Sequence, residues 1–274
     1  MKRASSQKAR IEANQLNLSS ALLALSVLAD SGVEHYRGSF QNRAMYAPLA
    51  VATLTLAASV MGTLDRRPRR HAARDSIYGI AAATGLAGLL FHAYNVTKRP
   101  GGLSWLNLFY AAPIGAPGAL VLAGFLGKGA ERARRPESGR QFGRTVAAVS
   151  AAGIAGTVLE TALLHFRGAY HNPAMVLPVS VPPVAATLLG AAAVAPNRRV
   201  GRVARWWLKA TALLGFVGVG FHAYGVSRNM GGWRNWSQNV LNGPPLPAPP
   251  GYTGLALAGL AALGLIDRGR AQNG

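Results

Sequence analysis

Long apolar stretches recur along the whole chain, and they constrain its fold more than any other feature. Each has roughly 15 to 21 residues, and a helix needs about 20 mostly apolar residues to cross the hydrocarbon core of a bilayer. Only 14% of the residues are charged, against about 25% in soluble domains. We therefore expect an all-α, polytopic integral membrane protein with about eight transmembrane helices. The expected spans are residues 16–35, 46–64, 76–96, 108–127, 146–166, 175–195, 206–226 and 252–266.

Two of these spans break the pattern. The last is short, and the sixth contains Pro178, Pro182 and Pro183, which remove backbone donors from a helix.

The first stretch lacks a small-residue cleavage site, so we interpret it as a retained helix and not as a signal peptide.

The formal charge of +20 is distributed in a way that indicates topology. Of the lysines and arginines, 22 fall in the N-terminal tail, the connections near 65–75, 128–144 and 198–209, and the C-terminal tail. The connections that alternate with these hold seven. An excess of Lys and Arg in short loops marks the cytoplasmic side, so both termini are expected in the cytoplasm. Membrane lipid is the partner that this pattern predicts, and no nucleic acid is expected. The composition and the charge bias predict the bacterial inner membrane.

The two halves of the chain match when one is shifted by 130 residues. Asp30, His35 and Arg37 then lie over Glu160, His165 and Arg167. The same shift places Phe91-His92-Ala93-Tyr94 over Phe221-His222-Ala223-Tyr224. Farther on, the second half has an insertion that ends in the proline-rich run 244–250. The pattern predicts a tandem duplication of a four-helix unit, with the two units parallel in the membrane because each has an even number of spans.

This interpretation divides the chain into five segments. They are a cytoplasmic N-terminal tail (1–15), a first four-helix repeat (16–127), a basic cytoplasmic linker (128–145), a second four-helix repeat (146–266) and a cytoplasmic C-terminal tail (267–274).

Ionisable residues gather at the expected outer ends of the odd-numbered spans. His35, His92, His165 and His222 lie there, two in each half, and ionisable groups in a span suggest function because they are costly in lipid. The candidate cofactor-binding residues are His35, His92, His165, His222, Asp30, Glu160, Arg37, Arg167, Tyr94 and Tyr224.

Four interpretations of these residues remain open. A haem b could take its two iron ligands from the four histidines, as His35 with His165 or His92 with His222. A quinone site could use His35, Asp30, Tyr36 and Asn42 in the first half, or His165, Glu160, Tyr170 and Asn172 in the second. A metal ion held by acid and imidazole is disfavoured, because residues five apart diverge by about 140° around a helix. The histidines could also simply sit at the membrane interface, where amphipathic rings are common.

The preferred function is a redox-linked membrane subunit that binds haem b or quinone on the extracytoplasmic side. It would anchor or serve a partner oxidoreductase subunit located outside the cytoplasm or in the membrane. The alternatives are a secondary transporter or channel with a proton relay, and a purely structural anchor. The sequence does not decide whether the protein is an enzyme.

Overall fold

A computed structural model describes residues 2–65, 71–110, 114–135 and 138–272, and within these ranges every regular element is a helix. Seven helices are long and apolar enough to cross a membrane. The chain is therefore an all-helical protein of the multi-pass membrane type, as the sequence predicts. The long helices are α1 (Lys2–Arg37), α2 (Ala47–Leu64), α3 (Ala72–Thr97), α5 (Gly115–Ala133), α6 (Arg140–Arg167), α7 (Leu177–Val194), α8 (Arg198–Arg228) and α10 (Pro250–Gln272). The short ones are η1 (Arg43–Tyr46), α4 (Trp105–Phe109), η2 (Pro173–Val176), η3 (Gly232–Asn235) and α9 (Trp236–Asn242).

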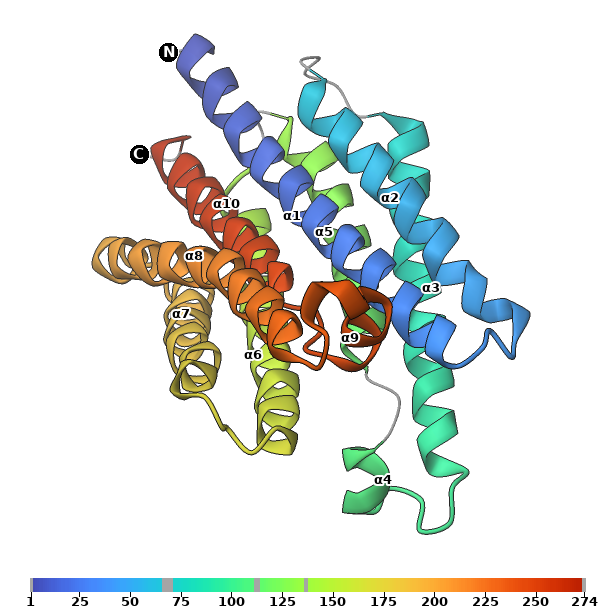
Figure 1. The fold of residues 1–274 in the computed structure, drawn as a ribbon. Coiled ribbons are helices and arrows are strands. Elements are labelled where there is room, and N and C mark those ends of the chain that lie inside the picture. Colours follow the sequence, from blue (N-terminus) through green and yellow to red (C-terminus); the bar gives the residue numbers. More distant parts are fainter. Residues whose placement is uncertain (1, 66–70, 111–113, 136–137, 273–274) are drawn as a thin grey trace.

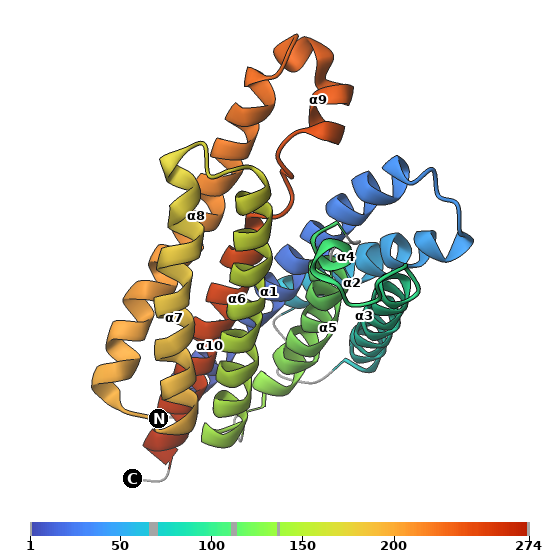
Figure 2. The ribbon, with the colours of Figure 1, turned by 90° about the horizontal axis from the view of Figure 1, so that it is seen from below.

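The long helices form two groups of four (Figure 1). In the first group α1 packs on α2 and α5, and α3 packs on the same two helices. In the second group α6 packs on α7 and α10, and α8 packs on those two as well. An extensive contact between α1 and α10 joins the groups, whereas α5 and α6 touch over a smaller area. Figure 2 shows both chain termini at the same end of the molecule, which we call the basic end.

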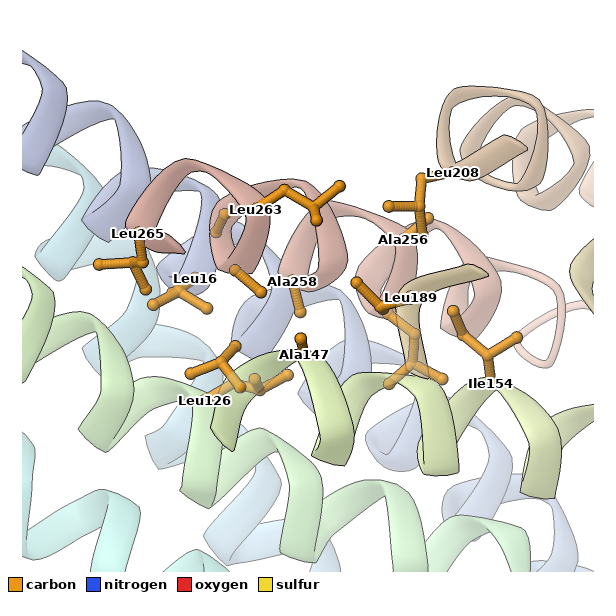
Figure 3. Packing of buried hydrophobic residues seen from close by; sticks show 14 of the residues in the cluster. Leu16, Leu126, Ala147, Ile154, Leu189, Leu208, Ala256, Ala258, Leu263 and Leu265 are labelled. Carbon is orange, nitrogen blue, oxygen red and sulfur yellow. The ribbon is translucent and has the colours of Figure 1, made fainter. Parts of the chain in front are cut away.

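The core lies where α1, α5, α6 and α10 meet (Figure 3). Small residues allow these helices to approach closely. A Cβ atom added to Gly143 would lie 2.8 Å from the backbone nitrogen of Ile266, and one added to Gly254 would lie 3.2 Å from the carbonyl oxygen of Ser19. The outer helices instead expose large apolar side chains, such as Leu90, which is 65% exposed. An apolar surface of this kind suits contact with lipid.

Most of the described residues in the basic segments continue the long helices. Residues 2–15 belong to α1, and residues 128–133 and 140–145 belong to α5 and α6. Residues 267–272 continue α10. The helices continue there because buried ion pairs satisfy some of the charges, including one between Arg268 and Glu12 at 2.9 Å.

The fourth expected span is displaced along the chain. It was expected over 108–127, but the long helix α5 begins at Gly115 and ends at Ala133. Leu108 lies in the short helix α4 instead. α5 is not among the seven apolar candidates, because its last turns carry Lys128, Glu131 and Arg132.

The sixth expected span remains one continuous helix despite its prolines. α7 runs through Pro182 and Pro183. Because Pro182 has no N–H, it leaves the carbonyl of Pro178 without its helical donor. The hydroxyl of Tyr252, in α10, donates to that carbonyl at 3.0 Å. A side chain from another helix thus replaces the missing backbone bond.

Candidate functional site

Three of the four histidines hold a connecting segment against a helix end. The Nδ1 of His35 bonds the carbonyl of Met45 at 2.7 Å, and that of His165 bonds the carbonyl of Met175 at 2.8 Å. His222 bonds the carbonyl of Pro245 at 2.7 Å. His92 is half-buried on α3, and it too has an interaction partner. These bonds give the rings a structural task in positioning the loops.

The same bonds fix which ring nitrogen carries the proton. A carbonyl oxygen only accepts, so Nδ1 must be the donor, and the neutral ring then presents the lone pair of Nε2. No described residue bonds Nε2 of His35, His165 or His222. An imidazole held in this way can bind a metal or accept a proton at Nε2.

The two turns that follow α1 and α6 have the same geometry. Asn42 and Asn172 each accept a hydrogen bond from the backbone N–H two residues later, both at 2.9 Å. Ser39 and Ala169 both have a φ of 55°, in the left-handed region. The side-chain oxygens of the two asparagines, which the quinone interpretation would use, therefore accept backbone N–H groups in these turns.

Glu160 binds the start of α5. Its Oε1 accepts the backbone N–H of Gly115, the first residue of that helix, at 3.1 Å. A carboxylate is stabilised there because the first N–H groups of a helix lack partners and carry partial positive charge. A Cβ at position 115 would overlap the carboxylate of Glu160. This close approach requires glycine.

Asp30 lies on α1, which packs on α5, but it has no donor comparable to the one that Glu160 has. It is partly buried, and Glu34 follows it four residues later on the same helix. Among the described residues, Asp30 has no hydrogen-bond or ion-pair partner. Asp30 and Glu160 occupy matching places in the two halves of the sequence. His165 and His222 lie on α6 and α8, which both pack on α7 and α10.

The remaining candidate residues do not pair with these acids. Arg37 pairs with Glu34 at 2.8 Å on the surface, and Arg167 lies over the rings of Phe109 and Tyr110, 5.6 Å from each. Tyr94 and Tyr224 are exposed, with Lys98 over the first ring and Arg228 over the second. No group of three or more His, Cys, Asp or Glu side chains suited to a metal ion occurs in the described part of the chain. A haem iron needs only two imidazoles, so this finding does not bear on haem.

The sequence analysis missed a buried ionic network at the basic end. Arg74 donates to Glu131 at 2.8 Å through Nε and to Asp65 at 3.0 Å through Nη2. Glu131 also accepts the N–H of His71 at 2.9 Å, and Arg134 donates to the carbonyl of Asp65 at 3.0 Å. The side chains of Arg74, Glu131 and Arg134 are 7%, 1% and 3% exposed. The sequence pattern places these residues in basic connections, and the signal that could have revealed the network is the rarity of acids in this chain.

No protein family, curated protein or solved structure matched this chain in the comparisons with known proteins. The proposals below therefore rest on the residues themselves.

Proposed function

We propose that the chain is a tandem duplication of a four-helix unit. Contacts within the first four helices support this, because they recur in the last four helices between residues shifted by a constant number of positions. Cβ atoms added to Gly88 and Gly218 would meet Pro117 and Pro249, at 3.3 and 2.8 Å. Likewise, the side-chain amide of Asn107 donates to the carbonyl of Gly102 at 2.9 Å, and that of Asn239 donates to the carbonyl of Gly232 at 2.7 Å. Positions therefore correspond at an offset of 130 up to α3 and α8, and of 132 in α5 and α10.

The proposed topology has eight crossings, with both termini and the basic end in the cytoplasm of a bacterial cell. The distribution of arginine and lysine supports it. The chain has no cysteine, so single cysteines can be labelled without background. In sealed spheroplasts an impermeant maleimide should label Asn235→Cys and should leave Arg135→Cys unlabelled until the membrane is opened. Labelling of Arg135→Cys from outside would reverse the orientation.

We propose that the protein uses Asp30 and Glu160 as a proton-relay site, as in a secondary transporter or channel. The observation that carries this proposal is the placement of two acids at the junction of α1, α5 and α6. Asp30 is partly buried on α1 without a hydrogen-bond or ion-pair partner among the described residues, and Glu160 of α6 binds the start of α5, which packs on α1. An acid that has no cation in a poorly hydrated place is costly, and such an acid suggests a function. The free Nε2 atom of His165, on the same helix as Glu160, and that of His222, on α8, offer proton acceptors. Sites of transporters often lie between repeats, and ionisable groups mark proton paths.

Infrared spectroscopy tests this site without a known substrate. In reconstituted membranes, a pH titration should produce a carboxylic-acid C=O band that Asp30→Asn removes or shifts. Glu34→Gln is the matched control, because Glu34 is an acid of the same helix that pairs with Arg37 at the surface. A potential applied across proteoliposomes should drive proton uptake that Asp30→Asn and Glu160→Gln reduce by about tenfold or more, as for loss of an acid–base group. Identical spectra and identical uptake in wild type and Asp30→Asn would reject the site.

A redox-linked subunit with haem b or quinone is the second candidate. The favouring observation is the Nδ1–H···O=C bond on His35, His165 and His222, because haem and metal ligands commonly have such a bond behind them. His165 with His222 is the pair to test first, because their helices both pack on α7 and α10. A reduced-minus-oxidised optical spectrum of protein purified from haem-supplemented cells should show b-type bands, and His165→Ala should remove them. A colourless protein rejects haem, and a lipid extract free of quinone rejects the quinone form. A partner oxidoreductase subunit is expected only if either group is present.

A further inference from the structure

A cavity of about 400 Å³ opens at the basic end, between the start of α8 and the end of α10. Four arginines line it, Arg198, Arg202, Arg205 and Arg270, together with the acid Asp267. Four positive charges against one negative charge leave the lining strongly cationic. This cavity lies at the end of the bundle opposite to the loops that the histidines hold, so it is independent of the proposed proton site.

The arginines differ in how they are engaged. Arg205 and Arg270 both bind Asp267, at 2.7 and 3.2 Å, so they share one carboxylate. Arg198 and Arg202 are exposed, and no hydrogen bond or ion pair joins either side chain to another described residue. Two guanidinium groups beside a partly open cavity are therefore available to an external anion. Guanidinium groups match the oxygens of a phosphate through paired N–H donors.

Part of the cavity wall is apolar. Leu263, Ile266 and Ala192 line it, and Gly201 leaves space next to Leu263, whose nearest carbon is 3.9 Å from where a Cβ would stand. A free inorganic anion gains nothing from an apolar wall, whereas a lipid places glycerol and acyl carbons next to its phosphate. The combination of a cationic rim and an apolar wall at a helix end is typical of sites for anionic lipid headgroups.

The described residues at the corresponding place in the first unit differ from those that line the cavity. Position 202 corresponds to Ala72 and position 205 to Asp75, while Leu263 corresponds to Glu131. There, the ionic network of Arg74 and Glu131 already pairs its charges internally. Arg202, Arg205 and Leu263 therefore have no like counterpart among the described residues of the first unit.

We propose that this cavity binds the phosphate group of an anionic phospholipid, such as phosphatidylglycerol. The lipid would fasten the cytoplasmic ends of α8 and α10 to the surrounding leaflet. The shared chemistry with free phosphate is recognition of phosphate oxygens by Arg198 and Arg202, and the apolar wall favours the lipid.

The test uses the full-length protein in a mild uncharged detergent with three probes. These are short-chain phosphatidylglycerol, short-chain phosphatidylcholine and inorganic phosphate, with binding followed by native mass spectrometry or calorimetry. Phosphatidylglycerol should bind best. The variant Arg198→Gln/Arg202→Gln should weaken its binding about 30-fold, which corresponds to a factor of roughly five to six for each arginine near a membrane surface.

The control variant Arg10→Gln/Arg135→Gln removes two exposed arginines elsewhere and should leave the affinity unchanged. Thermal unfolding of both variants shows that each is folded, because neither pair of side chains has a partner to lose. Tighter binding of inorganic phosphate than of phosphatidylglycerol would overturn the lipid assignment. Equal binding of phosphatidylcholine, or equal loss in the two variants, would overturn the site.

Discussion

The two four-helix units differ most in what fills their basic ends. In the first unit these positions hold Asp65, Arg74, Glu131 and Arg134, which form one buried ionic network. The positions that the proposed duplication makes equivalent hold Ala195, Ala204, Leu263 and Ile266 in the second unit. One arrangement of four helices thus accommodates either paired charges or apolar packing. The four charged residues therefore depend on one another, because a buried charge is tolerated only with its partner.

The largest expected effect comes from breaking the ionic set at one member. Glu131→Leu introduces the residue of the second unit but leaves Arg74 and Arg134 buried beside a lost carboxylate. We expect the free energy of unfolding to fall by about 3 to 5 kcal/mol, measured by denaturant titration in mixed micelles. Replacing all four residues with their counterparts (Asp65→Ala, Arg74→Ala, Glu131→Leu and Arg134→Ile) should restore most of that loss.

A surface acid provides the control for this prediction. Glu34→Gln removes an ion pair whose side chains are 47% and 39% exposed, so it should change the stability by less than about 1 kcal/mol. If the fourfold variant is less stable than Glu131→Leu, the four residues do not act as a set, and the comparison between the units fails.

A second effect concerns how closely the helices approach. A Cβ added to Gly124 would lie 2.6 Å from the backbone nitrogen of Ala82, in α3, whereas the corresponding position in α10 is occupied by the buried Ala256. Gly124→Ala should therefore force α3 and α5 apart and destabilise the protein by about 1 to 3 kcal/mol. Ala256→Gly removes a methyl group and creates no clash, so it should lower the free energy of unfolding by about 1 kcal/mol. Equal losses would show that the two helix pairs are spaced alike.

The helices were largely predictable from the sequence, because runs of apolar residues indicate spans without knowledge of tertiary contacts. The ends of α5 were not, since Lys128, Glu131 and Arg132 resemble a loop until the partner of Glu131 is known. The continuity of α7 was also hidden. The continuity of α7 depends on Tyr252, which lies 74 residues away from the carbonyl that it binds. No local sequence pattern predicts such a bond.

The candidate site was predicted only in part. The 130-residue repeat singled out Asp30 and Glu160, and the structure shows that Glu160 binds the start of α5 whereas Asp30 has no partner among the described residues. The sequence could not show that His35 and His165 bind backbone carbonyls. Those carbonyls lie in turns whose conformation depends on residues in the left-handed region, such as Ser39 and Ala169. Sequence patterns reveal which side chains are repeated, but they do not show which backbone atoms lie beside them.

The third effect is the coupling between Pro182 and Tyr252. The first unit has Ala52 and Leu120 at these places, so its helix keeps the N–H and needs no hydroxyl. Tyr252→Phe should lower the stability by about 1.5 kcal/mol. In a Pro182→Ala background the backbone supplies the donor, and the same substitution should have a smaller effect. A double-mutant cycle should give a coupling of about 1 kcal/mol, and a coupling near zero would mean that the hydroxyl does not replace the missing donor.

The smallest expected effect lies where the units agree. Asn42 and Asn172 accept the N–H of Ala44 and Ala174 at the same distance of 2.9 Å, at the start of η1 and η2. Each asparagine side chain accepts a backbone N–H that would otherwise lack a partner at the helix start. Asn42→Ala and Asn172→Ala should therefore each lower the free energy of unfolding by about 1 kcal/mol. Asn42→Asp and Asn172→Asp keep the accepting oxygen and should retain most of the stability. The two turns are in different units, so the losses should add in the double variant. A loss at one turn without a loss at the other would show that the shared backbone geometry conceals different energetics, and the correspondence between the units would then stop at shape.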